Sequence, residues 1–249
     1  MPEVRIAFLS DIHANMPALR AALESAASHG AARIVIAGDL VGDGPFPAET
    51  LQLIRDSGIT EVIRGNVDRN VLSLLRKKRK QVEKRRWTGD SKTRNRAWTA
   101  LQLPEADCDW LGELATEISL SVGSTEVLVV HGSALGDTDY VYPSITPEAL
   151  ERKLEAHSGP RPAVHVSGHS HIPFVREIAG VLVVNCGSVG RPADGDPRGA
   201  FAIVDFANPD TPLGEIVRFE YPVEETLEAI RVRDVPGIRR RQYRQGIKN

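Results

Sequence analysis

Seven side chains that can bind divalent metal ions stand in five short motifs, and each motif follows a predicted strand. Together they supply two carboxylates, one amide and four of the seven histidines of the chain. Oxygen and imidazole ligands of this kind suit Mn²⁺, Fe²⁺, Co²⁺ and Zn²⁺. The set is what two adjacent divalent ions need, so the pattern predicts a two-metal hydrolase acting on phosphate esters. The motifs are Asp11-Ile12-His13, Gly38-Asp39, Gly65-Asn66, His131-Gly132 and Gly168-His169-Ser170-His171.

The chemistry of such a pair of ions is well suited to phosphate. Two ions about 3.5–4 Å apart can hold an attacking oxygen and a phosphoryl oxygen together, and they lower the pKa of water from about 16 toward 7. Two divalent ions outweigh two carboxylates and one hydroxide, which leaves a net charge of about +1. That charge attracts a phosphate and stabilises the negative charge that develops in the transition state.

The residues between the motifs predict the elements that position them. Val4 to Ser10, Arg33 to Ala37 and Glu61 to Arg64 are apolar runs typical of strands buried on both faces. One helical stripe ends near Gly30, and a second runs from Pro47 to Asp56. The alternation of strands and helices implies right-handed crossovers and a parallel sheet. The motifs then lie at the carboxyl ends of neighbouring strands, where open α/β sheets keep their sites.

The second half of the chain is predicted to consist mainly of strands. Short connections such as Ala179-Gly180 indicate hairpins and antiparallel pairing, and Pro147 to His157 is the one clear helix. A parallel half and an antiparallel half predict the fold class α/β (α+β), a four-layer α/β/β/α sandwich in which two mixed β-sheets pack face to face between helices. The predicted strands are Glu126 to Val130, Ala163 to Ser167, Val181 to Asn185, Ala200 to Phe206 and Glu215 to Tyr221.

Composition and charge narrow the class of protein. The chain has 249 residues and a net charge of −2, so its bulk properties indicate a folded globular protein with no bias toward nucleic acid or membranes. No run approaches the roughly 20 apolar residues of a membrane span, and Cys108 and Cys186 lack metal-ligand spacing. We expect a cytoplasmic protein with one domain over residues 1–249, in which 236–249 form a flexible or a packed tail. The oligomeric state stays open, and a homo-oligomer is one alternative.

A strongly basic segment lies between the third and fourth motifs. Residues 76–96 hold eleven Lys or Arg against two acids, Glu83 and Asp90. Within a helical segment of about 68–100, these charges fit a solvated helix face, or a rim or cap that draws anionic substrates toward the site. Nucleic acid is a weaker alternative partner, because only Trp87 and Trp98 are available there to stack on bases.

The motifs resemble the five signature blocks of the calcineurin-like metallophosphoesterases. The resemblance extends from about residue 4 to residue 206, and the block from Asn185 to Pro192 is similar to that of the compact single-domain bacterial and archaeal phosphodiesterase branch. It implies a β-sandwich flanked by helices and the hydrolysis of a small phosphate ester by in-line attack of a metal-bridging hydroxide. The blocks are Ser10-Asp11-Ile12-His13, Gly38-Asp39, Gly65-Asn66-Val67-Asp68, Val130-His131-Gly132 and Gly168-His169-Ser170-His171.

The resemblance also implies a role for each site residue. Asp39 would bridge two divalent ions, for which Mn²⁺ is favoured and Fe, Zn, Co and Ni are alternatives. Asp39, Asp68 and Asn66 are the implied catalytic residues, and Asn66 would also bind the substrate. The first ion would be bound by Asp11, His13 and His171, and the second by Asn66, His131 and His169.

One position departs from the family pattern. The family's Gly-Asn block continues with a histidine that pairs with the following acid and is thought to protonate the leaving group, whereas this chain has Val67 there and keeps Asp68. Because valine cannot donate a proton, we expect a preference for esters with good leaving groups. Among substrate-binding candidates, Asn15 either contacts the phosphate or caps the helix that starts near Pro17. Arg191 either contacts the substrate or forms a surface salt bridge.

Several functions remain compatible with these residues. The missing histidine and the compact length favour phosphodiesters, and a phosphoprotein or dinucleoside-polyphosphate phosphatase is the alternative enzyme. A non-catalytic scaffold on the same fold is the alternative of another class, and the resemblance includes a eukaryotic sorting-complex subunit of that kind. Such scaffolds typically lose some metal ligands, whereas this chain has all seven.

Overall fold

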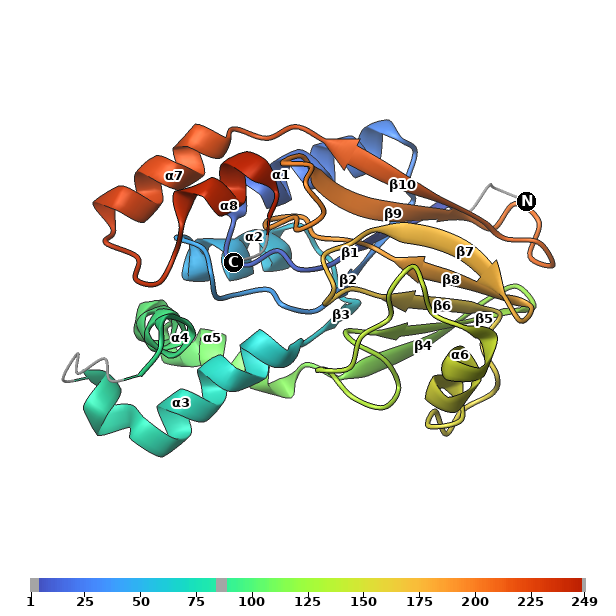
Figure 1. Ribbon diagram of the computed structural model, residues 1–249, viewed down its shortest axis with the longest axis horizontal. Helices are drawn as coiled ribbons and strands as arrows, with labels where there is room; N and C mark the ends of the chain where they lie inside the picture. The colour runs from blue at the N-terminus through green and yellow to red at the C-terminus, as the bar shows by residue number, and fades with distance from the viewer. Residues whose placement is uncertain (1–4, 84–88, 248–249) are drawn as a thin grey trace.

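Two five-stranded sheets form the centre of the protein (Figure 1). The structure is a computed structural model that describes residues 5–83 and 89–247, with the backbone alone for 76–83. The first sheet has the strand order β10-β9-β1-β2-β3. Its three N-terminal strands are parallel, β9 pairs antiparallel with β1, and β10 pairs antiparallel with β9. These strands are β1 (Arg5–Leu9), β2 (Arg33–Ala37), β3 (Val62–Ile63), β9 (Gly199–Asp205) and β10 (Leu213–Phe219).

The second sheet has the strand order β4-β5-β6-β8-β7. Its three central strands β5, β6 and β8 are parallel, while β4 and β7 pair antiparallel at the two edges. The expectation that the second half pairs mainly antiparallel is therefore wrong for this centre. The reason is the long connection through α6 between β5 and β6, because a crossover of that length returns the chain in the same direction. The strands are β4 (Glu117–Val122), β5 (Thr125–Val130), β6 (Val164–Ser167), β7 (Phe174–Ile178) and β8 (Val181–Asn185).

Eight helices of the described residues surround the sheets. The first two begin with a proline in their first turn, where the missing N–H costs nothing. Helices α3 and α4, from the basic segment, pack against each other. Side chains of that segment up to residue 88 lie outside the described residues. The helices are α1 (Met16–Ser28), α2 (Pro47–Asp56), α3 (Asn66–Glu83), α4 (Ser91–Gln102), α5 (Glu105–Glu113), α6 (Pro147–Leu154), α7 (Val223–Val232) and α8 (Arg240–Gln245).

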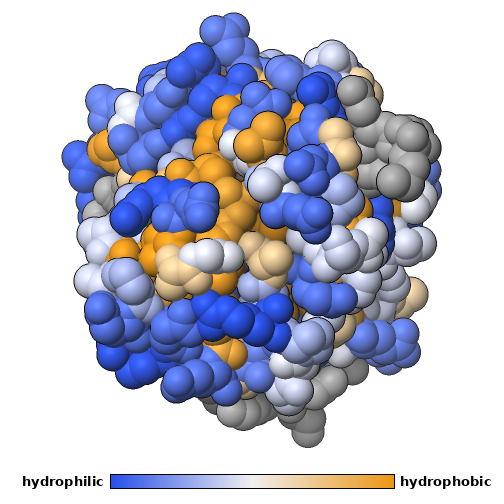
Figure 2. All heavy atoms as spheres, turned by 90° about the vertical axis from the view of Figure 1, so that its right-hand side faces the viewer, coloured by the Kyte–Doolittle hydropathy of each residue, from blue (hydrophilic) through white to orange (hydrophobic). Residues whose placement is uncertain are grey.

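The buried apolar residues form three layers that hold the four-layer sandwich together. Between the sheets, Phe8 and Val35 of the first sheet join Val129 and Val166 of the second in one cluster. The outer face of the first sheet packs against α1 and α2, and the outer face of the second packs against α6. Apolar side chains also reach the surface on the face at the right of Figure 1, where hydrophilic side chains surround them (Figure 2). The predicted fold class is thus confirmed.

Most predicted strands and helices lie where the sequence places them, and the exceptions are informative. The edge strands β4 and β7 were not predicted, nor were helices α5, α7 and α8. In the tail, α8 packs against α7 and buries Tyr243 completely, so this part of 236–249 is packed. No helix of the described residues is long and apolar enough to cross a bilayer.

The fold brings the motifs together at one edge of the two sheets. Asp11 follows β1, Asp39 follows β2, and Asn66 follows β3 at the start of α3. His131 follows β5, and His169 lies in the loop after β6. All five strands belong to the parallel parts of their sheets, so their carboxyl ends point to a common place, as open α/β sheets do at their binding sites.

Candidate metal centre

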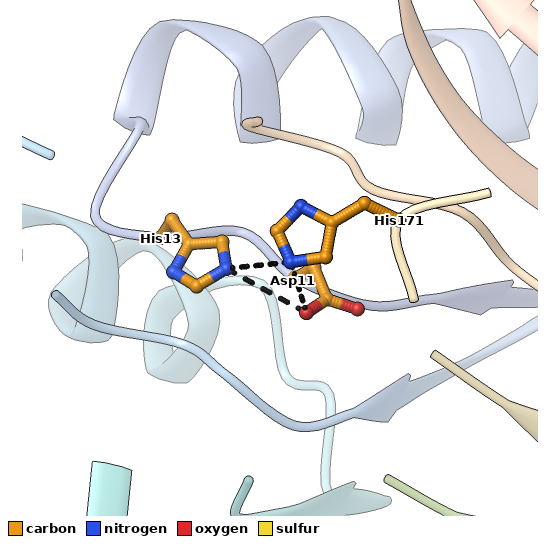
Figure 3. Close-up of side chains that lie close together, drawn as sticks. All are labelled: Asp11, His13 and His171. Carbon is orange, nitrogen blue, oxygen red and sulfur yellow. Dashed lines mark hydrogen bonds and ion pairs between the residues drawn. The ribbon is translucent and has the colours of Figure 1, made fainter. Parts of the chain in front are cut away.

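The first group of metal-ligating side chains consists of Asp11, His13 and His171, all of them buried (Figure 3). Asp11 Oδ1 lies 3.1 Å from His171 Nε2 and 3.6 Å from His13 Nε2. The two Nε2 atoms are 3.2 Å apart. Three donor atoms therefore point at one common position, which is the arrangement that a single divalent ion requires.

The second group consists of Asp39, His131 and His169, and it lies beside the first. Asp39 Oδ2 is 3.4 Å from His131 Nε2 and 3.8 Å from His13 Nε2, which belongs to the first group. The Asp39 carboxylate thus lies between the two groups. Asn66 Oδ1 completes the second group, 3.1 Å from His131 Nε2. The structure therefore brings together all seven residues predicted as metal ligands.

Backbone carbonyls fix which ring nitrogen of two histidines faces the site. His131 Nδ1 lies 2.8 Å from Ala37 O, and His171 Nδ1 lies 2.5 Å from Arg191 O. Because a carbonyl oxygen can only accept, both Nδ1 atoms donate, and a neutral ring then presents its Nε2 lone pair to the site. Hydrogen bonds of this kind orient metal-ligating histidines in proteins.

Lone pairs that face one another without a donor provide a test of whether a cation fits. His131 Nε2 and Asn66 Oδ1 are both acceptors when the ring is neutral, so their 3.1 Å approach needs a proton or a cation between them. Asp11 Oδ2 accepts from Ser10 Oγ and from the His169 amide, both at 2.8 Å, while Asp11 Oδ1 has no hydrogen-bond partner. A buried carboxylate oxygen without a donor is costly, and divalent cations fit these donor atoms.

The backbone at the site adopts an uncommon conformation. Five of the seven residues have a positive φ: 54° at Asp11, 52° at His13, 53° at Asp39, 62° at His169 and 60° at His171. For a residue with a Cβ this conformation costs roughly 1–2 kcal/mol. Asp, Asn and His tolerate it better than most other residues, and such strain clusters at functional sites.

The charges of the metal-free site compensate one another. Burial opposes protonation of His131, but the carboxylates of Asp39 and Asp11 raise its pKa to about 10. Burial lowers the pKa of His169 to about 4, so this ring is neutral at pH 7. Burial also opposes ionisation of Asp11, yet His171 and His131 hold the pKa of this carboxyl well below its usual range. A divalent ion would therefore have to displace the proton of His131 when it binds.

Asp68 lies beneath the site and does not line its cavity. It is fully buried, and its carboxylate accepts hydrogen bonds from the amides of Gly65 at 2.9 Å, Leu40 at 3.2 Å and Val41 at 3.0 Å. Burial, followed by the charge of Asp39, raises its pKa to about 7. Asp68 thus ties the loop after β2, which carries Asp39, to the loop after β3, which leads to Asn66.

Asn15 occupies the capping position that the sequence analysis offered as one of its two roles. It is buried and lies outside the cavity. Its Oδ1 accepts from the Ala18 amide at 3.3 Å and from Thr226 Oγ1 at 2.9 Å, while its Nδ2 donates to Gly190 O at 2.8 Å. All of these contacts are within the protein, so the side chain holds α1 in place.

A cavity of about 200 Å³ opens over the two groups. Arg191 lines it and donates from Nη1 to Asp43 Oδ2 at 2.6 Å, so the salt bridge expected as one alternative forms at the cavity itself. Lys92 and Arg96, one turn apart on α4, line the same cavity and belong to the predicted basic segment. Tyr140 also lines the cavity and was not predicted as a site residue from the sequence. The only signal was an aromatic residue in a polar loop after the fourth motif.

Comparison with known proteins gives one family. A model described as the calcineurin-like phosphoesterase superfamily domain matches residues 4–209. A Methanocaldococcus jannaschii protein, itself described as uncharacterized, is 29% identical, and the match covers 92% of this chain and 93% of that protein. All five motifs lie within the matched residues, so the match includes the whole candidate metal centre.

Solved structures agree with the fold. A metallophosphoesterase from Sphaerobacter thermophilus superposes with a TM-score of 0.75 and 25% identity, covering 98% of this chain and all of that one. A hypothetical protein from Pyrococcus horikoshii superposes with a TM-score of 0.80 and 22% identity, covering 99% of this chain and all of that one. The arrangement of two sheets between helices is therefore shared over nearly the full length.

Proposed function

The chain belongs to the calcineurin-like phosphoesterase superfamily, and on that premise we propose that it is a phosphodiesterase that uses two divalent metal ions. One observation carries the proposal: Asp39 Oδ2 lies within 3.8 Å of ring nitrogens from both ligand groups, His131 on one side and His13 on the other. A carboxylate in that position can join two ions into one centre. Paired ions of this kind are used by enzymes that cleave phosphate esters.

Each of the two groups of metal-ligating side chains would hold one ion. Asp11, His13 and His171 would hold one ion. When bound, the two ions would polarise the phosphoryl oxygens and supply a water of lowered pKa. Mn²⁺ is the ion we favour, because the donor set mixes carboxylate, amide and imidazole. Asn66, His131 and His169 would hold the other ion, with Asp39 between them.

Cationic side chains of the protein supply the attraction for the substrate. Lys92, Arg96 and Arg191 line the cavity over the ligand groups. Positive charge at the mouth of a cleft raises the local concentration of an anionic substrate and its rate of association. Arg191 is held by Asp43, so its guanidinium keeps a fixed place at the cavity wall. Asn66 also lines the cavity, and its amide can donate to a phosphoryl oxygen there.

The choice of phosphodiesters rests on charge and on Val67. A diester carries one negative charge where a monoester carries about two, so a diester matches the net charge of about +1 expected for two divalent ions, two carboxylates and one hydroxide, and its cleavage releases one alcohol. Val67 lines the cavity at the position where the family has histidine, and it offers no proton for that alcohol. Its backbone amide donates to Asp39 Oδ1 at 2.8 Å, so the residue supports the metal site through its main chain.

A substrate panel tests the proposal. With Mn²⁺ added, a bis-aryl phosphate is expected to be hydrolysed with a kcat/KM at least about tenfold higher than the matching aryl monophosphate, because the single charge of the diester matches the net charge of the loaded centre. A cyclic nucleotide, a dinucleoside polyphosphate and a phosphopeptide complete the panel. If the phosphopeptide or the dinucleoside polyphosphate is the best substrate, the corresponding phosphatase is the function. Absence of any hydrolysis with two bound ions would favour the scaffold.

The rate should depend steeply on the leaving group. Across a series of aryl and alkyl diesters, kcat/KM is expected to fall as the pKa of the leaving alcohol rises, since general-acid catalysis worth about 10²–10⁴-fold is missing at Val67. A Val67→His variant should flatten this dependence and raise turnover of the poorest leaving groups. Val67→Gln is the matched control, because it adds similar bulk without a titratable ring. A flat dependence in the wild-type protein would contradict the prediction.

A further inference from the structure

An exposed pair of aromatic side chains stands beside the metal-ligand groups. Tyr140 and Tyr142 are 38% and 40% exposed, and Leu135 on the same loop is 59% exposed. These are three of the five large apolar side chains that are exposed among the described residues. A cluster of exposed apolar groups next to a polar cavity commonly marks a binding surface, and no step of the proposed reaction uses it.

The rings are arranged in a row that starts at the ligand groups. The Tyr140 ring lies 4.2 Å from the His169 ring, centroid to centroid, with a tilt of 31°. The Tyr142 ring lies nearly parallel to that of Tyr140, with 8° between the planes and 5.1 Å between centroids. This separation exceeds the contact distance of about 3.5–4 Å between carbon atoms. The two tyrosines are therefore displaced sideways, and each leaves part of its ring exposed.

The loop that carries the pair is held in place by charged contacts. Arg69 of α3 binds Asp137 through two hydrogen bonds of 2.6 and 2.9 Å. Asp139, next to Tyr140, accepts hydrogen bonds from Ser133 and from Lys153 of α6. Anchors on both sides of the loop reduce the freedom that the rings would lose when a ligand binds, which favours affinity.

The size of the cavity indicates that a substrate extends beyond it. A volume of about 200 Å³ is smaller than the roughly 300–1,000 Å³ of pockets that enclose a whole organic ligand. The cavity can take a phosphoryl group, so the remainder of the ester must lie across the mouth. Tyr140 lines the cavity, and the exposed Tyr142 ring stacks against it.

We propose that Tyr140 and Tyr142 form a stacking subsite for the base of a small nucleotide-type phosphate ester whose phosphate lies at the two ligand groups. The inference rests on the proposed function and adds the class of substrate. Aromatic side chains stack on nucleobases with little dependence on base identity, so the subsite would favour nucleotides as a class. Lys92 and Arg96 in the same cavity suit the phosphates of such a ligand.

A pair of ligands that differ only in the base tests this subsite. Binding of AMP and of ribose 5-phosphate to the Mn²⁺-loaded protein is measured by calorimetry, since both carry the same phosphate and sugar. We expect AMP to bind about tenfold more tightly, in line with the strength of base–aromatic stacking. The double variant Tyr140→Ala, Tyr142→Ala should reduce this ratio to below about twofold, and Tyr140→Phe, Tyr142→Phe should keep it. A single-stranded oligonucleotide that bound more tightly than AMP would instead make nucleic acid the ligand and overturn the assignment.

Controls separate the subsite from the metal site. Leu213→Ala removes an exposed apolar side chain of β10, outside this loop, and should leave the ratio unchanged. Metal content is measured for each variant because Tyr140 touches the His169 ring. Equal binding of AMP and ribose 5-phosphate by the wild-type protein, or an equal loss of both in the double alanine variant, overturns the stacking subsite. Failure of the proposed function has a different signature, since neither ligand would then bind and no ester would be hydrolysed.

Discussion

Replacing Asp39 by Asn is expected to lower kcat for a bis-aryl phosphate by at least about 10³-fold, which is the upper end of the loss seen when one charge-stabilising group is removed from an active site. Asparagine keeps the shape of the side chain and can still accept the hydrogen bond from the Val67 amide, which is 2.8 Å in the wild-type structure. It loses the negative charge that lies between the two groups, 3.4 Å from His131 Nε2 and 3.8 Å from His13 Nε2. The bound metal should fall from two ions per chain to one or fewer.

The matched control for this variant is Asp43→Asn. Asp43 also lines the cavity, but its carboxylate pairs with Arg191 at 2.6 Å and lies 4.0 Å from His13 Nδ1, outside both ligand groups. We expect its kcat to fall less than about tenfold, because Asp43 lies outside both ligand groups and its loss affects only the placement of Arg191. Steady-state kinetics and elemental analysis of both proteins, with circular dichroism to confirm folding, decide the matter. An Asp39→Asn variant that keeps two ions and full turnover would remove the basis for a bridged centre.

Removal of the metal ions is expected to abolish hydrolysis and to lower the melting temperature. An ion present at 100 times its dissociation constant stabilises the folded state by about 2.7 kcal/mol, which corresponds to roughly 5–10 °C for a chain of this size. The shift arises because the folded protein alone brings the ligand atoms together, and among them Asp11 Oδ1 has no hydrogen-bond partner. Thermal unfolding with chelator and with Mn²⁺ measures it.

Two histidine variants identify the source of that shift. His169→Ala removes a metal-ligating side chain of the second group and should halve the rise in melting temperature that the metal causes. His29→Ala removes a histidine from the surface and should leave that rise unchanged. The gain should also shrink as the pH falls, because a protonated imidazole does not bind a cation and the pKa of His131 is about 10 in the metal-free site. A melting temperature that does not respond to Mn²⁺ at pH 8 contradicts the prediction.

The strands that position the site are predictable from the sequence because they are buried on both faces. The runs that became β1 and β2 are apolar after their first Arg, and β6 carries buried Val164 and Val166. Each run ends in a polar motif, so both their course and their end are visible in the residues. β4 and β7 were missed because they lie at sheet edges, where exposed positions such as Glu117, Arg176 and Glu177 break the apolar pattern.

Side-chain roles at the site were harder to predict than the ligands themselves. A carboxylate and an imidazole signal metal binding by their chemistry, whereas the role of Asp68 depends on three backbone amides brought to it from two loops. Nothing in the sequence around Asn15 distinguishes a helix cap from a phosphate contact, and only Thr226 and Gly190, far along the chain, decide it. Tyr140 could not be placed because its importance comes from the fold of one long loop against His169.

The positive φ angles at Asp11, His13, Asp39, His169 and His171 have a consequence for how such a protein can evolve. Glycine enters this conformation more easily than any other residue, so a mutation from one of these residues to glycine would erase a coordinating atom while relaxing the main chain. Descendants of this gene could therefore lose coordinating atoms one position at a time, while the relaxed main chain offsets part of the side-chain contacts that are lost. An inactive relative that has glycine at these positions would be the expected product of such a loss.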